Sequence, residues 1–290
     1  MSHYEPNAVL STKEYRVVGK RPVRHDGANK VTGEARYGAD MVLPGMMYGA
    51  ILRSPHGHAR IRQIDASCAL TIPGVRAVVT AADFPEPVLP DDFQLLNLMA
   101  RDKVLYKGHS VAAVAAASLH EAQEALELID VDYEPLPVVI DAEKAMMEDA
   151  PILHHGLQAV MDPESLELEA WPPNVANHFV QELGDLDAGF TQADVIVEKQ
   201  THTGAVHQGY LEPHAGTAMW HGDGRLTVWS SSQGHFAVRD LTAKVCCVPV
   251  SKVRAVPLEI GGGFGAKLRA YVEPVAALLA RKAEAPVKIV

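Results

Sequence analysis

Residues 259–267, Glu-Ile-Gly-Gly-Gly-Phe-Gly-Ala-Lys, form the segment whose backbone is best suited to bind a ligand. Glycines allow positive φ angles and let backbone N–H groups approach an anion closely. An apolar run precedes the segment and a helical pattern follows it, so we expect a strand, a glycine turn and a helix whose N-terminus favours an anion. The segment is not a P-loop, because Leu268 follows Lys267 where Ser or Thr is required. A turn that binds no ligand is the alternative.

A second candidate is Gln233, within the run Trp-Ser-Ser-Ser-Gln-Gly-His at residues 229–235. The run ends a predicted hairpin strand and begins a predicted helix, so Gln233 lies at the carboxyl end of a strand, where binding sites often form. Its carboxamide offers two donor hydrogens and an acceptor oxygen. We therefore treat Gln233 as a candidate binding residue, with a helix cap or a surface position as the alternative.

Two histidines and a glutamate fall within residues 207–214, His-Gln-Gly-Tyr-Leu-Glu-Pro-His, which is the composition of a metal-ligand set. The spacing is not HExxH, and Pro213 breaks any helix that would align the ligands. We expect a turn held by a hydrogen-bond network instead. The same interpretation applies to His56 and His58 in Ser-Pro-His-Gly-His.

The cysteines provide neither a metal site nor a disulfide framework. The chain has three in 290 residues: Cys68 stands alone, and Cys246 and Cys247 are adjacent. Adjacent cysteines suit neither a CxxC redox pair nor zinc ligation. We expect all three to be small buried residues. The GxSxG motif of a nucleophilic serine is absent as well.

Length and composition restrict the class of protein. A chain of 290 residues predicts about two domains, and 48% apolar residues are enough for packed cores. The net charge of −10 argues against nucleic acid or an anionic membrane as a partner, because both require a basic face. No apolar run approaches the length of a spanning helix, and the N-terminus lacks the pattern of a secretory signal. We therefore expect a cytoplasmic protein.

Hydrophobic patterns divide the chain into an arm and two structured units separated by a linker. Residues 1–17 are expected to be a loose arm, and residues 18–140 an α+β unit. In this unit, alternation and apolar runs predict strands, and spaced apolar positions between glutamates predict a helix. The expected strands are 47–52, 75–80, part of 104–117 and 129–139, and the expected helix is 119–128.

Residues 141–175 are acidic and poor in strand signals, so we interpret them as a linker. A second unit is expected over residues 176–290. Its predicted helices are 185–193, 236–245 and 273–282, and its predicted strands are 195–202, 216–220, 225–230, 253–260 and 286–290. An apolar strand at 286–290 is an unusual end for a domain, so this unit is expected to be incomplete, with its remainder supplied by another chain or a longer precursor.

These motifs, in this order, resemble the large subunit of the xanthine dehydrogenase/aldehyde oxidase family of molybdenum hydroxylases. The stretch that begins Gly-Lys-Arg-Pro-Val-Arg-His-Asp-Gly at residue 19 resembles the opening of that subunit's α/β hammerhead domain. The segments HQGYLEPH, WSSSQGHFAVRD, EIGGGFGAK and EPVAALLARKAEAPVKIV resemble the start of its molybdopterin-binding domain. The similarity extends over nearly the whole chain from Val18 onward.

The resemblance implies a molybdenum–pterin cofactor, in the cytosine dinucleotide form. Gln233 would then donate its amide to the oxo ligand of molybdenum, and Gly262, Gly263, Phe264 and Gly265 would contact the metal and the pterin dithiolene. Gln233 and Phe264 would lie nearest to molybdenum. Pterin sulfurs hold the metal in this family, which is consistent with the missing Cys or His ligand set.

Two departures from the family pattern bear on activity. Relatives that oxidise purines have an acidic residue directly after the lysine of the glycine turn, whereas this chain has Leu268, which argues against xanthine as substrate. The family's general base is a glutamate far toward the C-terminus of the subunit, beyond residue 290. No catalytic residue is therefore assigned, and we expect the chain alone to be inactive.

The resemblance also implies partners: the remaining part of the molybdopterin-binding subunit, an iron–sulfur subunit with [2Fe–2S] centres, and a subunit carrying FAD. The substrate would be an aldehyde, an N-heterocycle or a related small molecule hydroxylated by water. Two alternatives remain at this stage. One is a non-catalytic docking or scaffold fragment of such a complex, and the other is a nucleotide-binding α/β protein that uses the glycine turn as a phosphate site.

Overall fold

The computed structural model describes residues 15–84, 93–154, 160–161, 174–175, 177–178, 181 and 183–290. Contacts between Cα atoms divide the chain into one unit up to Arg36 and a second from Tyr37 to Val290. The described part of the first unit holds helix α1 (Gly27–Thr32), which ends at Gly33 in the left-handed conformation. The other helices and strands that the structure describes all belong to the second unit.

A mixed sheet forms the centre of the second unit. In the described part of the chain it has seven strands in the order β11-β10-β9-β12-β1-β5-β3. The pairs β1–β12 and β10–β11 are parallel, and the other neighbours are antiparallel. The strands are β1 (Met47–Arg53), β3 (Val75–Thr80), β5 (Ser110–Ala116), β9 (Gly216–Trp220), β10 (Leu226–Ser230), β11 (Val253–Pro257) and β12 (Val287–Ile289).

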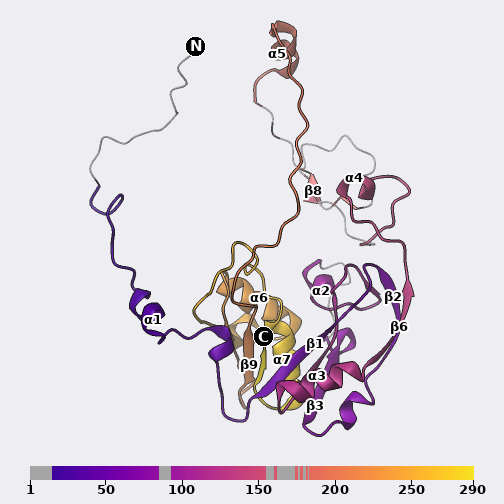
Figure 1. Ribbon diagram of the computed structural model, residues 1–290, viewed down its shortest axis with the longest axis vertical. Helices are drawn as coiled ribbons and strands as arrows, with labels where there is room; N and C mark the ends of the chain where they lie inside the picture. The colour runs from indigo at the N-terminus through magenta and orange to yellow at the C-terminus, as the bar shows by residue number, and fades with distance from the viewer. Residues whose placement is uncertain are drawn as a thin grey trace. The chain divides into compact units, whose positions relative to one another are not determined.

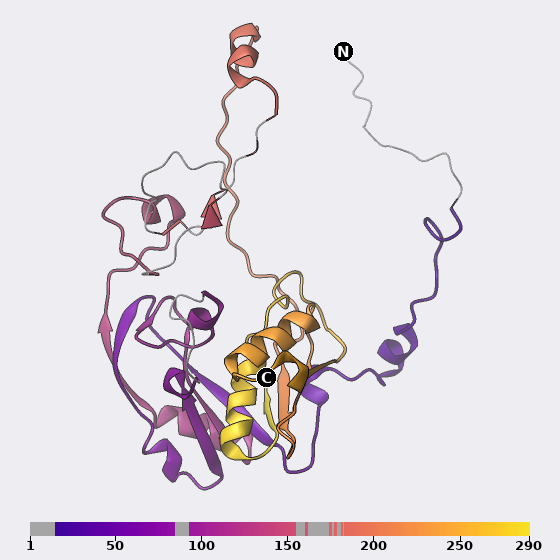
Figure 2. The ribbon, with the colours of Figure 1, turned by 180° about the vertical axis from the view of Figure 1, so that it is seen from behind.

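Helices cover both faces of this sheet, and strand β5 shows why. Each of its residues is buried. Because side chains of a strand alternate between faces, Ala113 and Ala115 join the core cluster that contains α7, while Ala112 and Val114 join the cluster that contains α3. Figures 1 and 2 show α6 and α7 side by side, with α7 packed against β9 and α6 against β11. The helices are α3 (Leu119–Glu127), α6 (His235–Val245) and α7 (Glu273–Ala283).

Smaller elements complete the unit. A three-stranded sheet has the order β4-β2-β6, and a short parallel pair joins β7 and β8. These strands are β2 (Ala59–Asp65), β4 (Lys103–Val104), β6 (Asp130–Pro135), β7 (Val160–Met161) and β8 (Asn177–His178). Among the residues that the structure describes, the remaining helices are α2 (Phe93–Leu98), α4 (Ala142–Ala145) and α5 (Leu186–Gln192), with single 3₁₀ turns at Gly38–Asp40, Ala69–Thr71, Ala81–Asp83 and Val250–Lys252.

The α+β class is confirmed, and most predicted elements are present within a few residues of their expected ends. The strand predicted at 286–290 is β12, which lies between β9 and β1 and pairs with both. The strand predicted at 195–202 is wrong. These residues lie outside any strand, and all eight are exposed. Weak alternation alone does not form a strand, because the backbone also needs a partner to satisfy its hydrogen bonds.

The predicted arm and the predicted linker can be compared with the structure only in part, because many of their residues lie outside those that the structure describes. The arm predicted at residues 1–17 lies mostly outside them. Of the predicted linker, residues 141–154 are described and contain α4, whereas most of the rest falls outside. Because one sheet combines strands from both predicted units, sheet membership does not separate them, and the boundaries 18–140, 141–175 and 176–290 stay predictions. No helix in the described residues has the length and apolar character needed to cross a bilayer.

Candidate functional site

The glycine turn follows the end of β11. After Pro257, Glu259 forms an isolated bridge with Tyr37, and the chain then bends through residues 261–267. The next helix, α7, begins only at Glu273. The helix predicted at 273–282 is therefore present, but residues 268–272 separate its N-terminus from the turn. The side chain of Glu273, the first residue of α7, accepts the backbone N–H of Tyr271 at 3.0 Å, so a carboxylate of the chain itself lies at this N-terminus.

Gln233 lies where the sequence predicted, between the end of β10 at Ser230 and the start of α6 at His235. Its backbone N–H donates to the Lys267 carbonyl at 2.8 Å. Its side-chain Oε1 accepts the backbone N–H groups of Gly265 at 3.0 Å and Lys267 at 3.3 Å. Two donors on one side fix which end of the carboxamide is oxygen. The amide NH₂ therefore points away from the turn and has no hydrogen-bond partner among the described residues.

The turn has room for this carboxamide only because residue 263 is glycine. A Cβ at Gly263 would lie 2.5 Å from Oε1 of Gln233, well inside contact distance. Gly262 and Gly265 have φ angles of +102° and +92°, which L side chains rarely adopt. Phe264 also has a positive φ, of 50°, and its side chain is 73% exposed. Gln233 and the predicted turn residues are thus brought together, and the Phe264 ring is exposed to solvent.

A buried ion pair between Lys267 and Glu212 holds the glycine turn in place. The Lys267 ammonium donates to Oε2 of Glu212 at 2.8 Å, and the two side chains are 1% and 10% exposed. The same oxygen accepts the N–H of Gly261 at 2.7 Å, and Oε1 accepts the N–H of Gly38 at 3.2 Å. Glu212 thereby joins the histidine-rich segment 207–214 to the glycine turn.

Lys267 connects both candidate motifs. Its backbone carbonyl accepts the N–H of Gln233 and the hydroxyl of Ser232, at 2.8 and 2.9 Å. Burial alone would raise the pKa of the Glu212 carboxyl, but the ammonium of Lys267 and the N–H groups of Gly261 and Gly38 lower it overall. Glu212 therefore stays ionised and holds this segment to the glycine turn through its ion pair and hydrogen bonds.

The aromatic and histidine side chains of residues 207–214 pack together without forming a metal set. The ring of Tyr210 lies 5.2 Å from that of His207 and 5.6 Å from that of His214, centroid to centroid. The Lys267 ammonium lies 5.0 Å from the centroid of the Tyr210 ring, within the range of a cation–π contact. The described part of the chain holds no group of three or more His, Cys, Asp or Glu side chains arranged to bind a metal ion. Hydrogen bonds do hold the segment: His207 Nδ1 accepts the backbone N–H of Gly209 at 3.0 Å, and Glu212 accepts from Gly261, Gly38 and Lys267, as the expected network requires.

The remaining candidate residues, two histidines and three cysteines, lie outside the glycine turn, and their contacts are those of structural residues. His58 Nδ1 donates to the Pro137 carbonyl at 2.7 Å, and the His56 backbone N–H donates to Ser54 Oγ at 3.0 Å. Cys246 is buried, and this burial raises the pKa of its thiol to about 12. Cys68 and Cys247 are exposed, so the expectation of three buried cysteines is wrong for two of them. Both lie in turns, at residues 67–68 and 246–247, where the backbone leaves the core.

Sequence reasoning missed the role of Lys267 as a buried structural cation. The sequence indicates Lys267 only as the lysine of a P-loop, which Leu268 excludes, and Glu212 only as a metal ligand. The two residues are 55 positions apart. No periodicity links positions that distant, and pairing them requires the sheet to place segment 207–214 beside the glycine turn.

Comparisons with known proteins match both halves of the chain. The model of the molybdopterin cofactor-binding domain matches residues 168–290, and the model of the aldehyde oxidase and xanthine dehydrogenase a/b hammerhead domain matches residues 32–137. The chain is 35% identical over 287 residues to the carbon monoxide dehydrogenase large chain of Afipia carboxidovorans, covering 95% of this chain and 35% of that one.

Two further similarities agree. The nicotinate dehydrogenase large molybdopterin subunit of Eubacterium barkeri is 35% identical over 283 residues, which cover 96% of this chain and 62% of that one. The crystal structure of quinoline 2-oxidoreductase from Pseudomonas putida superposes with a TM-score of 0.78 at 30% identity, covering 94% of this chain and 34% of that one. The chain therefore spans between about a third and two thirds of the length of these relatives.

Proposed function

Because the chain belongs to the xanthine dehydrogenase/aldehyde oxidase family of molybdenum hydroxylases, we propose that it is part of the molybdopterin-binding catalytic subunit of such an enzyme. We assign residues 18–140 to the hammerhead domain, 141–175 to a linker and 176–290 to the start of the cofactor-binding domain. Its relatives are molybdenum oxidoreductases acting on carbon monoxide, nicotinate and quinoline, according to their names. The observation that carries the proposal is the fixed carboxamide of Gln233 beside the glycine turn.

The residues present fit a molybdenum–pterin group. Such a group is anionic, and it takes its metal ligands from the pterin sulfurs, so the protein has to supply hydrogen-bond donors and space. Gln233 offers a neutral NH₂ donor whose orientation is set by two backbone N–H groups. The side of Gly265 is open, since a Cβ added there would meet no atom within 4 Å. We assign Gln233, Gly262, Gly263, Phe264 and Gly265 to the cofactor site.

When bound, the group would supply a two-electron oxidation in which a small molecule is hydroxylated with oxygen from water. The chain's own residues act by holding and orienting it. Gln233 donates a hydrogen bond without adding a competing charge or metal ligand. Phe264 offers an apolar face to the same site. The ion pair of Lys267 and Glu212 keeps Gln233 and Phe264 in position, because Glu212 also accepts the Gly261 N–H and so holds the turn.

Several finer parts of the proposal follow the family resemblance. We propose the cytosine dinucleotide form of the pterin, with [2Fe–2S] centres and FAD on partner chains, in the cytoplasm. The substrate is an aldehyde, an N-heterocycle or a related small molecule, and Leu268 argues against a purine. The general base is a glutamate in the remaining part of the subunit, so the chain by itself would be inactive.

Metal and pterin analysis of the purified assembly tests this proposal. We expect molybdenum and a released pterin nucleotide in near-equal amounts, and a large loss of both in Gln233→Ala. The exposed Gln123 on α3 provides a matched control, since Gln123→Ala should retain both. An assembly that contains the chain but neither molybdenum nor pterin would favour the alternative of a non-catalytic docking fragment.

A further inference from the structure

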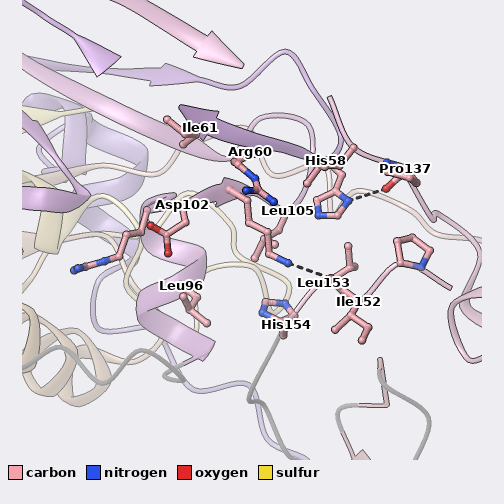
Figure 3. A pocket seen from close by; sticks show the side chains of 14 residues that line it. His58, Arg60, Ile61, Leu96, Asp102, Leu105, Pro137, Ile152, Leu153 and His154 are labelled. Carbon is pink, nitrogen blue, oxygen red and sulfur yellow. Dashed lines mark hydrogen bonds between the residues drawn. The ribbon is translucent and has the colours of Figure 1, made fainter. Parts of the chain in front are cut away.

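A cavity of about 690 Å³ lies in the second unit, away from the glycine turn. Its walls come from β2, from the segment around β4, from the end of β6 and from residues 151–154. Figure 3 shows His58, Arg60, Asp102 and His154 among the side chains around it. None of the residues assigned to the cofactor lines this cavity, so its role is independent of the proposed function.

Cationic groups dominate the charged part of the wall. Arg60, Arg101 and Lys103 line it, and Asp102 is the single acidic residue among the lining residues that the structure describes. The Lys103 ammonium donates to the Ile152 carbonyl at 3.1 Å, a neutral acceptor that does not compensate its charge. Within the described residues this ammonium forms no ion pair, and two of its hydrogens remain for a ligand. In a chain with a net charge of −10, this concentration of positive charge is local.

These cations repel one another. Burial lowers the pKa of the Lys103 ammonium, and the positive charge of Arg60 lowers it further. Burial also lowers the pKa of His154, and the charge of Lys103 adds to that effect. Arg60 lies 3.7 Å from a Glu134 oxygen, but the same oxygen is 3.4 Å from Arg62, so one carboxylate serves two guanidiniums. An anion in the cavity would relieve this repulsion.

His58 adds an independent observation. Its side chain is buried, at 4% exposure, and Nδ1 lies 2.7 Å from the Pro137 carbonyl. Because a carbonyl only accepts, Nδ1 carries the hydrogen. The second nitrogen, Nε2, is buried without a hydrogen-bond partner in the described residues. Figure 3 shows this ring beside Arg60 with Nδ1 turned to Pro137. Nε2 can therefore accept a hydrogen bond from a ligand hydroxyl.

The rest of the wall is apolar. Leucine, isoleucine and proline side chains provide it, among them Ile61, Leu96 and Leu136. Burying an apolar group against them is favourable, whereas an inorganic ion would leave this surface in water. A cavity of this size accommodates a small organic molecule, not only an ion. We propose that the cavity binds a small organic anion, with an apolar ring or chain against the leucines, carboxylate or phosphate oxygens on Lys103 and Arg60, and a ligand hydroxyl donating to Nε2 of His58.

Calorimetric titration of the purified full chain with four probes tests this site: phthalate, benzoate, inorganic phosphate and neutral benzamide. We expect phthalate to bind most tightly, because it combines two charges with a ring, then benzoate, then phosphate, with no measurable binding of benzamide. Lys103→Gln should weaken phthalate binding about tenfold, the effect of one lost charge-assisted hydrogen bond. Binding of benzamide as tight as that of phthalate would overturn the proposal.

Two further variants separate binding from folding. Lys107→Gln removes a nearby exposed lysine that does not line the cavity, and it should leave phthalate affinity unchanged. His58→Asn keeps a donor for the Pro137 carbonyl and removes the acceptor Nε2. It should weaken binding of 3-hydroxybenzoate, whose hydroxyl can donate to Nε2, and leave benzoate binding unchanged, while the unfolding midpoint changes little. Equal affinity of wild type and Lys103→Gln, or equal losses for Lys103→Gln and Lys107→Gln, would show that the cavity binds no anion specifically. Molybdenum content should be the same in all of these variants.

Discussion

At the scale of single residues, the buried pair of Lys267 and Glu212 is the least expected feature of the candidate site. Taking two charges out of water has a large cost, which their attraction offsets only with good geometry and further hydrogen bonds. Both conditions hold, because Glu212 accepts from Lys267, Gly261 and Gly38. Removing one partner would leave the other buried and charged.

Lys267→Met should therefore destabilise the fold by about 3 kcal/mol or more, since an uncompensated carboxylate would remain in the interior. Adding Glu212→Gln should recover part of that loss, because a neutral amide needs no counter-charge. Urea unfolding monitored by tryptophan fluorescence measures both. Arg225→Met, which breaks the exposed pair with Asp223, is the matched control and should leave the unfolding midpoint nearly unchanged. A double variant less stable than Lys267→Met would contradict this account.

His109 makes a second prediction at this scale. Its side chain is fully buried, and burial is the main cause that lowers its pKa from 6.5 to about 4. The unfolded chain takes up a proton near pH 6.5, whereas the folded chain does so only near pH 4. Stability is therefore complete above pH 6.5 and falls by up to about 3 kcal/mol as the pH drops to 4.

Unfolding free energies measured at several pH values check this prediction. The slope between pH 6.5 and 4 should be smaller in His109→Gln than in wild type, because the variant has no proton to take up at this position. His120→Gln, on the exposed face of α3, should keep the wild-type slope. Identical slopes in all three proteins would show that His109 does not contribute.

At the scale of elements, two loops form the site, and the strands that precede these loops are hydrogen-bonded neighbours in the sheet. The loop after β10 carries Gln233, and the loop after β11 carries the glycine turn. These two strands are parallel, so their carboxyl ends lie at the same edge of the sheet. The hydrogen bonds from Gly265 and Lys267 to Gln233 then close the gap between the loops.

Gly263→Ala tests this contact. The added Cβ would lie 2.5 Å from Oε1 of Gln233, so the carboxamide must move out of the turn. We expect molybdenum and pterin content of the assembly to fall severalfold, with a modest change in stability. Gly222→Ala, in the hairpin between β9 and β10, is the control because its Cβ would meet no atom within 4 Å. Full cofactor content in Gly263→Ala would show that the position of Gln233 is not needed.

At the scale of the whole second unit, one junction joins strands from distant parts of the sequence. Strand β12 pairs in parallel with β1 and antiparallel with β9. Gly49 of β1 lies opposite Ile289, and a Cβ at residue 49 would lie 2.5 Å from Cγ1 of that isoleucine. The close approach of these strands therefore depends on a glycine. With a continuous core on one face of the sheet, we expect the unit to unfold in one cooperative step.

Gly49→Ala should destabilise the unit by about 2 kcal/mol, the typical effect of overpacking a filled core. Urea transitions followed by fluorescence of Trp220 and Trp229 and by far-UV circular dichroism should coincide in wild type and shift together in the variant. Gly189→Ala, in α5, adds a Cβ in open space and should not destabilise. Two separate transitions in wild type would mean that residues 37–140 and 183–290 unfold independently.

The sequence by itself determined the α+β class, most helices and strands, the loop position of Gln233 and the family. These features depend on local patterns and motif order, which a linear chain displays directly. Only the tertiary structure decided which charges are paired in the interior, since Glu212 and Lys267 meet through a sheet that joins distant segments. It also decided that residues 195–202 form no strand, because a strand is a pairing of two segments and the pattern of one segment does not specify its partner.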